Sequence, residues 1–454
     1  MQVLIVFVMV AVLSFEFLAG HGWLPQIIKY SPEVLAIGVA ILVIVAGVRS
    51  RFQYVRPVYW LVFGGLVLII ICGAVVNHLE PGPIFAGLRM YFWALPFFFL
   101  PAVLDIKEHQ LRFQLLLLLS IGLLQLPIAW EQRMVTLTSG LETGQAVYAG
   151  DSTVGTLMGS GLLTVFLACA ACVLTAFFLR KRISAKIFLP LIILLLVPTM
   201  LNETKSALVI LPVALFTCFV TGAKPGARLK NTVAGLVAAV CFVAVFVPVY
   251  DRFVKPRWGY GIVDFIMMEG RVEGYLDRGS QIGEYEKSAG KIGGLKVAVS
   301  ELANDPVNLA FGLGIGNVSE SALGEKFTGK YFSVYAVFVE SSAIHIIFEF
   351  GLMGLALVLL LYWLLFKDSL SVARHSQGIM GALAIAWAGV IMAMLIGMFS
   401  NNLIESHALS MLFWYFSGLI AAHRMREAIS AAEYATDPAA LRYVVRAEEP
   451  DAAV

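Results

Sequence analysis

The polar stretch 198–207 carries a lysine where a phosphate group could bind. Lys205 lies there at a tight turn between two apolar runs, and Thr204 or Ser206 is placed to cap the helix that follows. A helix N-terminus attracts anions, and a neighbouring lysine strengthens that attraction. The stretch therefore predicts a phosphate site, with a capped helix start and a Lys205–Glu203 ion pair as the alternative.

Two further cations could join such a site. Lys291 opens an amphipathic segment, so its side chain can project from a helix start. Arg89 lies in the outer part of the apolar run 84–104, where a fixed cation could face an anionic lipid headgroup. Snorkelling to the interface, or pairing with Glu80, is the alternative for Arg89. We expect Arg89, Lys205 and Lys291 to lie where they can contact an anionic group.

A carboxylate and an imidazole flank the start of the apolar run 341–366. Glu340 lies at the expected water boundary, and His345 is about 140° further around a helix and roughly 7.5 Å deeper. Such a pair can act as a general base toward a hydroxyl group. A buried histidine more often hydrogen-bonds a neighbouring helix, and Glu340 also suits a helix start. The functional interpretation has Glu340 as the catalytic base, tuned by His345.

No motif for a metal or a cofactor accompanies these residues. The sequence has no P-loop, no dinucleotide fingerprint, no zinc-ligand spacing and no Ser-His-Asp pattern. All five cysteines lie inside apolar runs, where they behave as small hydrophobic side chains. We expect no metal site, no cofactor and no nucleic-acid partner.

The elements that position these residues must be membrane-spanning helices. The chain has 454 residues, is 60% hydrophobic and only 14% charged, and has a mean hydropathy of +0.86. A soluble core could not bury so much apolar surface. A spanning helix needs roughly 20 apolar residues, and such runs recur along the chain. The composition predicts an all-α, multi-pass membrane protein.

The apolar runs predict about twelve transmembrane helices, near residues 2–19, 33–48, 58–76, 84–104, 111–129, 155–179, 187–201, 206–222, 231–249, 341–366, 379–398 and 406–423. Lysine and arginine gather in alternate loops, and the opposite short loops hold few of them. By the positive-inside rule, this sorting places both termini in the cytoplasm. A moderately long polar loop is expected at 130–154 on the outer side.

The runs divide the chain into nine helices in 1–249, an outer cap in 250–340, three helices in 341–423 and a cytoplasmic tail in 424–454. Apolar residues recur at helical spacing between Ile292 and Leu302, which predicts an amphipathic helix in the cap. An Asn-Asp-Pro sequence ends that helix, and the glycine-rich turn Gly312-Leu-Gly-Ile-Gly316 follows.

This arrangement resembles the superfamily of O-antigen ligases and Wzy-type polysaccharide polymerases. The resemblance covers the topology, the large loop between the ninth and tenth spans, and two short motifs. One motif is Thr204-Lys205-Ser206, which is similar to the family's Ser-Arg or Thr-Arg turn. The other motif runs from about 287 to 355 and comprises Lys291, the amphipathic helix, Asn304-Asp305-Pro306, the glycine-rich turn, Glu340-Ser341 and Glu349-Phe-Gly351-Leu-Met-Gly354.

Two features depart from the family pattern. The two family arginines correspond here to Lys205 and Lys291, which keep the charge but not the bidentate grip on phosphate. Where the ligases carry a catalytic histidine, alignment on Gly351 places Glu340. The acidic form looks more like the polymerase members, so the resemblance favours a polymerase.

The resemblance implies a metal-independent glycosyltransferase at the periplasmic face of a bacterial inner membrane. Its donor would be a polyprenyl-pyrophosphate-linked oligosaccharide, and its acceptor the sugar of another lipid-linked repeat. Arg89, Lys205 and Lys291 would gather around the diphosphate of the donor. Membrane lipid and other polysaccharide-assembly proteins would be its partners. The alternatives are an O-antigen ligase that uses lipid A-core as acceptor, a polytopic transporter or flippase, and a non-catalytic membrane scaffold.

Overall fold

The computed structural model describes residues 2–50, 52–143, 153–223, 226–277 and 290–436. Throughout these residues the regular structure is helical, without strands. Eight of the described helices are long and apolar enough to cross a membrane, and a bent pair raises the number to nine. The protein is therefore a helical, multi-pass membrane protein.

The long apolar helices are α1 (Gln2–Gly20), α2 (Ser31–Ser50, preceded by the 3-10 turn η1, Gln26–Tyr30), α3 (Pro57–Val76), α6 (Glu108–Thr143), α7 (Ser160–Leu179), α10 (Arg228–Trp258), α16 (Ser342–His375) and α17 (Gly378–Ser400). The other helices of the bundle are α4 (Pro81–Phe92), α5 (Pro96–Val103), α8 (Ala185–Leu201), α9 (Ala207–Thr221) and α18 (His407–Thr436). The cap contains α11 (Ile262–Met267), α12 (Arg271–Leu276), α13 (Lys291–Leu302), α14 (Pro306–Phe311), the 3-10 turn η2 (Glu325–Phe327) and α15 (Phe332–Tyr335).

Each predicted span overlaps at least one of these helices, but several boundaries differ from the prediction. α10 continues to Trp258, into the segment predicted as cap, and α16 continues to His375. The run 84–104 is broken into α4 and α5, which bend by 49° because Pro96 has no N–H to donate back along the helix. The polar loop predicted at 130–154 is wrong up to Thr143, because α6 continues to that residue. The predicted tail also begins as helix, since α18 runs to Thr436.

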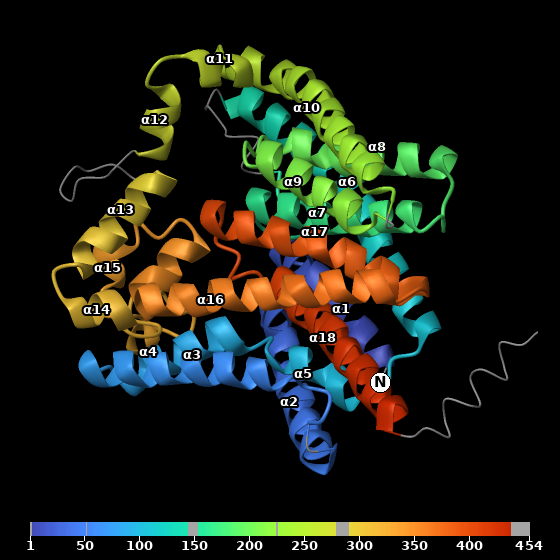
Figure 1. Cartoon of the computed structure of the whole chain (residues 1–454). Helices are drawn as coiled ribbons and strands as arrows, with labels where there is room; N and C mark the ends of the chain where they lie inside the picture. The colour runs from blue at the N-terminus through green and yellow to red at the C-terminus, as the bar shows by residue number, and fades with distance from the viewer. Residues whose placement is uncertain (1, 51, 144–152, 224–225, 278–289, 437–454) are drawn as a thin grey trace, which may run out of the picture.

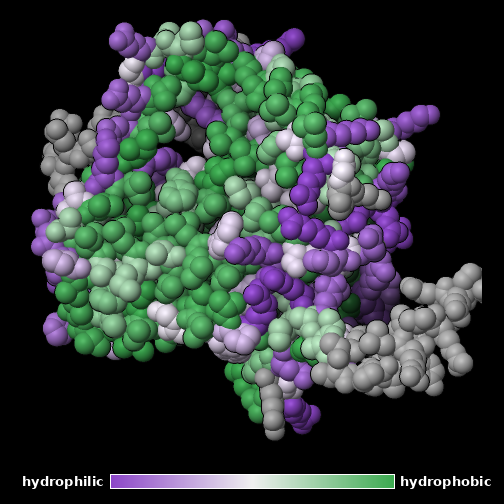
Figure 2. Space-filling model, viewed as in Figure 1, coloured by the Kyte–Doolittle hydropathy of each residue, from purple (hydrophilic) through white to green (hydrophobic). Residues whose placement is uncertain are grey.

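The centre of the bundle is built on α7 and α17, which are almost wholly enclosed by protein, whereas α2 and α10 expose most of their surface. Figure 1 shows α16 and α17 side by side, with α7 and α9 next to α17. The cap helices α13, α14 and α15 gather at the end of the bundle away from the N-terminus (Figure 1). Apolar side chains cover much of the face in Figure 2, as a lipid-facing flank requires.

The predicted glycine-rich turn is confirmed, and it docks on a break in α16. Gly351 interrupts that helix with a φ of 66°. The N–H of Leu313 donates to the Phe348 carbonyl at 2.7 Å, which the break makes accessible. A Cβ at Gly312 would lie 2.4 Å from the backbone carbon of Glu349, so only glycine permits this approach. The two glycine motifs of the sequence thus form one packing unit.

The side chain of Glu349 holds the docked turn in place. Its carboxylate accepts the backbone N–H groups of Gly316 (2.8 Å) and Val318 (3.1 Å) and the hydroxyl of Ser319 (2.6 Å). The residue is 1% exposed, and a buried carboxylate requires such donors. Glu349 therefore fixes the glycine-rich turn of the cap to the first part of α16.

Candidate functional site

A cavity of about 780 Å³ lies between the bundle and the cap. Its lining contains two cations, Lys205 before α9 and Lys291 at the start of α13. The lining also includes Ser160, Glu203, Thr204, Ser206, Tyr250, Phe265 and Tyr275. Figure 2 shows the surface hollowed between the arch of α11 and α12 and the body of the bundle. The cavity thus joins segments that are far apart in the sequence.

The turn that carries Lys205 is held rigidly from three sides. Asn202 donates to the Ser160 carbonyl at 2.9 Å, which ties the end of α8 to the start of α7. Tyr250 donates its hydroxyl to the Glu203 carbonyl at 3.2 Å. Glu203 has a φ of 56°, a left-handed conformation that is uncommon for a residue other than glycine. Its carboxylate lies 2.5 Å from a guanidinium nitrogen of Arg133, which is 1% exposed.

The Glu203 carboxylate therefore pairs with Arg133. Lys205 lies against two aromatic rings, with its ammonium 5.1 Å from the centroid of Phe265 and 4.9 Å from that of Tyr275. Such contacts stabilise a cation while leaving it in the cavity lining.

The expected hydroxyl cap of α9 is not made. Ser206 occupies the N-cap position, but its side chain makes no capping hydrogen bond. The hydroxyl oxygens of Thr204 and Ser206 are buried, and neither has a hydrogen-bond partner among the described residues. Buried polar groups normally have partners, so two unpaired hydroxyls beside Lys205 indicate a place for a polar ligand. The N-termini of α7 and α9 also face this cavity and favour an anion there.

The second cation, Lys291, is brought to the cavity by glycines at the start of α13. A Cβ at Gly290 would lie 2.4 Å from the Leu276 carbonyl oxygen, and a Cβ at Gly294 2.6 Å from that of Phe338. These close approaches set α13 against the segment that precedes α16. The Lys291 ammonium then donates to the carboxylate of Glu340 at 2.9 Å and to its backbone carbonyl at 3.2 Å.

The structure places Glu340 beside Lys291 and apart from His345. The side chains of Lys291 and Glu340 are 26% and 31% exposed, and of the two only Lys291 lines the cavity. His345 is 3% exposed, and its Nε2 lies 2.8 Å from the Ser319 hydroxyl and 3.6 Å from a carboxylate oxygen of Glu349. The expected Glu340–His345 pair is therefore not formed, because His345 points into the polar cluster under the glycine-rich turn.

Arg89 does not line the cavity, so the predicted gathering of three cations reduces to two. The alternative in which Arg89 pairs with Glu80 is also wrong. Arg89 forms a bidentate pair with Glu33 of α2, at 2.5 and 2.7 Å. His407 approaches the same carboxylate at 2.9 Å. A carboxylate with two such neighbours neutralises Arg89 inside the apolar layer, which is how membrane proteins accommodate a charge.

Sequence reasoning missed Arg133, Phe265 and Tyr275. Arg133 was counted with the residues of an outer loop, and the aromatic pair stood in the cap without a recognised pattern. The sequence did contain a signal for Arg133, because the helix of the preceding long apolar run can continue through this residue. For Phe265 and Tyr275 the sequence offers none, because their shared contact with Lys205 depends on the path of the chain between α10 and α13.

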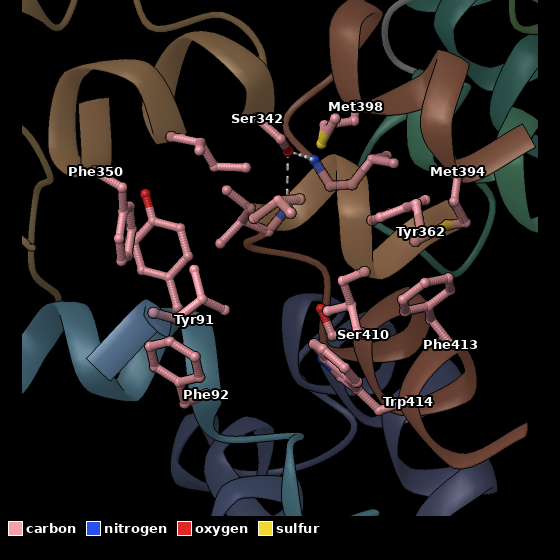
Figure 3. Close-up of a pocket in the computed structure, with 16 residues that line it drawn as sticks. Tyr91, Phe92, Ser342, Phe350, Tyr362, Met394, Met398, Ser410, Phe413 and Trp414 are labelled. Atoms are coloured by element: carbon pink, nitrogen blue, oxygen red, sulfur yellow. Dashed lines mark hydrogen bonds between the residues drawn. The ribbon is translucent and has the colours of Figure 1, made fainter. Parts of the chain in front are cut away.

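A second cavity, of about 120 Å³, is apolar and lacks the groups that acid–base chemistry requires. Figure 3 shows Tyr91 and Phe350 on one side of it and Tyr362, Met394 and Phe413 on the other. Its wall is completed by Ser342, whose hydroxyl accepts the backbone N–H of Leu403 at 2.6 Å (Figure 3). Without a carboxylate, imidazole or cation in its lining, this cavity can supply only apolar contact.

Comparisons with known proteins assign no family to the chain. No model of a known protein family matches it, and none of the curated protein sequences matches it either.

Proposed function

We propose that the protein is a polysaccharide polymerase of the membrane glycosyltransferase type. It transfers a glycan from polyprenyl pyrophosphate to the sugar of another lipid-linked repeat unit, at the periplasmic face of a bacterial inner membrane. The product is an exopolysaccharide or O-antigen chain. The proposal rests on the resemblance to the O-antigen ligase and polymerase superfamily, taken together with the charges of the cavity.

The observation that carries the proposal is the pairing of Lys205 and Lys291 in one cavity. Lys205 and Lys291 come from the two different motifs of the resemblance and are 86 positions apart in the sequence. Both nevertheless line the same cavity. A diphosphate leaving group needs cations and oriented donors as the glycosidic bond breaks. Lys205, Lys291 and the N-termini of α7 and α9 can provide both.

The chemistry is a substitution at the anomeric carbon of the donor. The acceptor hydroxyl oxygen forms a bond to that carbon, and the bond from the carbon to the phosphate oxygen breaks. Polyprenyl diphosphate leaves with the bonding electrons, and the acceptor proton passes to the carboxylate of Glu340. Lys291 lies within a hydrogen bond of Glu340, so a single ammonium can contact both the base and the leaving phosphate. No redox step or cofactor takes part in this balance.

The membrane arrangement of the proposal has twelve crossings, with both termini in the cytoplasm and the cap in the periplasm. The bent pair α4 and α5, the shorter helices α8 and α9, and α18 would complete the set begun by the long helices. The sorting of lysine and arginine between loops supports this orientation. It places the cavity at the periplasmic end of the bundle.

The test is an analysis of lipid-linked glycans and surface polymer from cells that lack the protein. Accumulation of single repeats on the lipid carrier, without long chains, is the result expected of a polymerase. Full-length chains retained on the carrier would replace the proposal with a ligase. Unchanged glycans would refute both enzymes and leave transport or a structural role.

A further inference from the structure

The short helix α11 has two faces of different character. Its inner face carries Ile262, which is 2% exposed, and Phe265, whose ring lies against Lys205. Its outer face carries Val263, Ile266 and Met267, which are 50%, 58% and 79% exposed. Ile266 and Met267 also border a hollow of about 510 Å³ beside α12 and the start of α13. An exposed apolar patch of this kind marks an interaction site.

The height of α11 relative to the membrane follows from α10. Residues 232–249 of α10 contain no charged side chain, and at 1.5 Å per residue they span roughly 27 Å, close to the thickness of the hydrocarbon layer of about 30 Å. Asp251 follows immediately and marks the outer edge of the apolar layer. The N–H of Ile262 donates to the Asp251 carboxylate at 2.7 Å, so α11 begins at that edge.

Further contacts hold α11 at this level. Lys255 of α10 lies 3.1 Å from the Asp264 carboxylate, and Gly261 donates its N–H to the same carboxylate at 2.8 Å. That N–H, together with the Lys255 ammonium, lowers the pKa of Asp264, so the carboxylate is charged at neutral pH. Figure 1 shows α11 next to the end of α10.

The apolar face of α11 continues the lipid-facing flank of α10. Val237, Val240 and Val245 on α10 are more than half exposed and belong to a span that is largely uncovered by protein. After the apolar face, the exposed cation Arg271 lies between the exposed carboxylates Glu269 and Glu273. Exposed apolar residues beside charged residues at the membrane edge are typical of a segment that lies in the interface.

We propose that α11 is inserted in the outer interface of the bilayer, with Val263, Ile266 and Met267 among the upper acyl chains. Its partner is the lipid surface itself. Because Phe265 on the opposite face contacts Lys205, α11 then forms the wall that separates the lysine of the cavity from lipid. The inference depends only on the membrane location of the bundle and is independent of the proposed function.

The test places a fluorescent label on Met267→Cys and measures its quenching in lipid vesicles. Cys72→Ala and Cys241→Ala first remove the two native cysteines that are not buried. Quenchers are attached to the lipid acyl chains in one set of vesicles, and iodide is added to the water in another. Val240→Cys on the flank of α10 is the lipid control, and Ala303→Cys in the exposed segment after α13 is the water control.

We expect acyl-chain quenching at position 267 to be at least about threefold stronger than at 303 and comparable to that at 240. Iodide quenching at 267 equal to that at 303 would overturn the proposal, because α11 would then lie in water. Protection from both quenchers in a dimeric protein would also overturn it, since a second copy would be the covering partner. No glycan enters this measurement, so its outcome is separate from that of the polymerase test.

Discussion

Replacement of Lys205 by alanine is the sharpest perturbation of the proposed diphosphate site. A cation about 4 Å from a phosphate charge contributes about 4 kcal/mol at the effective dielectric constant of about 20 that suits such sites. Since about 1.4 kcal/mol corresponds to a factor of ten in rate, the upper limit is a loss of nearly a thousandfold. Water in a cavity of about 780 Å³ weakens the interaction, so we expect kcat/KM to fall by about a hundredfold or more.

The same substitution also removes the contacts of Lys205 with Phe265 and Tyr275. Each contributes about 0.5–1 kcal/mol to folding, so the unfolding temperature should fall by only a few degrees. Lys205→Arg keeps the charge and the ring contacts and should retain most of the activity. Lys296→Ala is the matched control, because that lysine is 59% exposed on the cap and pairs with Asp277.

The assay is polymer formation by the purified protein in nanodiscs, supplied with the lipid-linked repeat unit. Chain products are separated by gel electrophoresis, and the initial rate is followed at several donor concentrations. The reasoning fails if Lys205→Ala forms chains within about threefold of the unchanged protein, since a cation beside the leaving group must affect the rate more than that. It also fails if Lys296→Ala loses as much activity, because the effect would then come from the cap as a whole.

Substitutions at three further residues test the base and the framework of the site. Glu340→Gln should abolish chain growth at unchanged expression, and normal polymer on the same gel assay would exclude Glu340 as the base. Glu349→Ala leaves the docked turn without its acceptor, at about 1–3 kcal/mol for each N–H that remains buried, so the unfolding temperature in detergent should drop by several degrees. An unchanged temperature would contradict the docking role. Arg133→Met leaves the Glu203 carboxylate buried beside an apolar side chain, at about 3–5 kcal/mol. Arg133→Lys should recover part of that loss, and equal stability of the Met and Lys variants would refute the ion pair.

The sequence predicted the helices well because the signal is local. The apolar run of α10 predicts a membrane-spanning helix from its length and hydropathy alone, whether its side chains face lipid or protein. The same reasoning failed at α6, where the polar residues Glu131, Gln132 and Arg133 indicated a loop. Arg133 is inside the protein because Glu203 and the carbonyls of Leu201 and Phe253 receive its guanidinium. Those partners are distant in sequence, so no local pattern reveals them.

For the candidate site, too, some features followed from the sequence and others did not. Lys205 and Lys291 were expected to lie in one site, and both line the same cavity. The ion-pair alternative for Arg89 used Glu80, which is close in sequence, whereas the structure pairs Arg89 with Glu33 on α2. His345 was linked to Glu340 by its position on a helix, but the neighbouring turn supplies Ser319 instead. Ion pairs between helices depend on packing, which a single sequence does not specify.

The turn from Asn202 to Ser206 is built more strongly than a connection between two helices requires. A left-handed residue costs about 1–3 kcal/mol unless it is glycine, yet Glu203 occupies that position. The Arg133 ion pair and the Tyr250 hydrogen bond offset this cost, because both act on Glu203. A glycine at 203 would turn the chain without strain, but it would give Arg133 no carboxylate and leave the turn free to move. Glu203 therefore adds backbone strain to the turn, but its contacts fix the positions of Lys205 and the neighbouring hydroxyl groups. Fixed donors need not reorganise when charge develops on a leaving phosphate. A cation held in this way can stabilise the transition state more than the bound substrate, and only then does it accelerate the reaction.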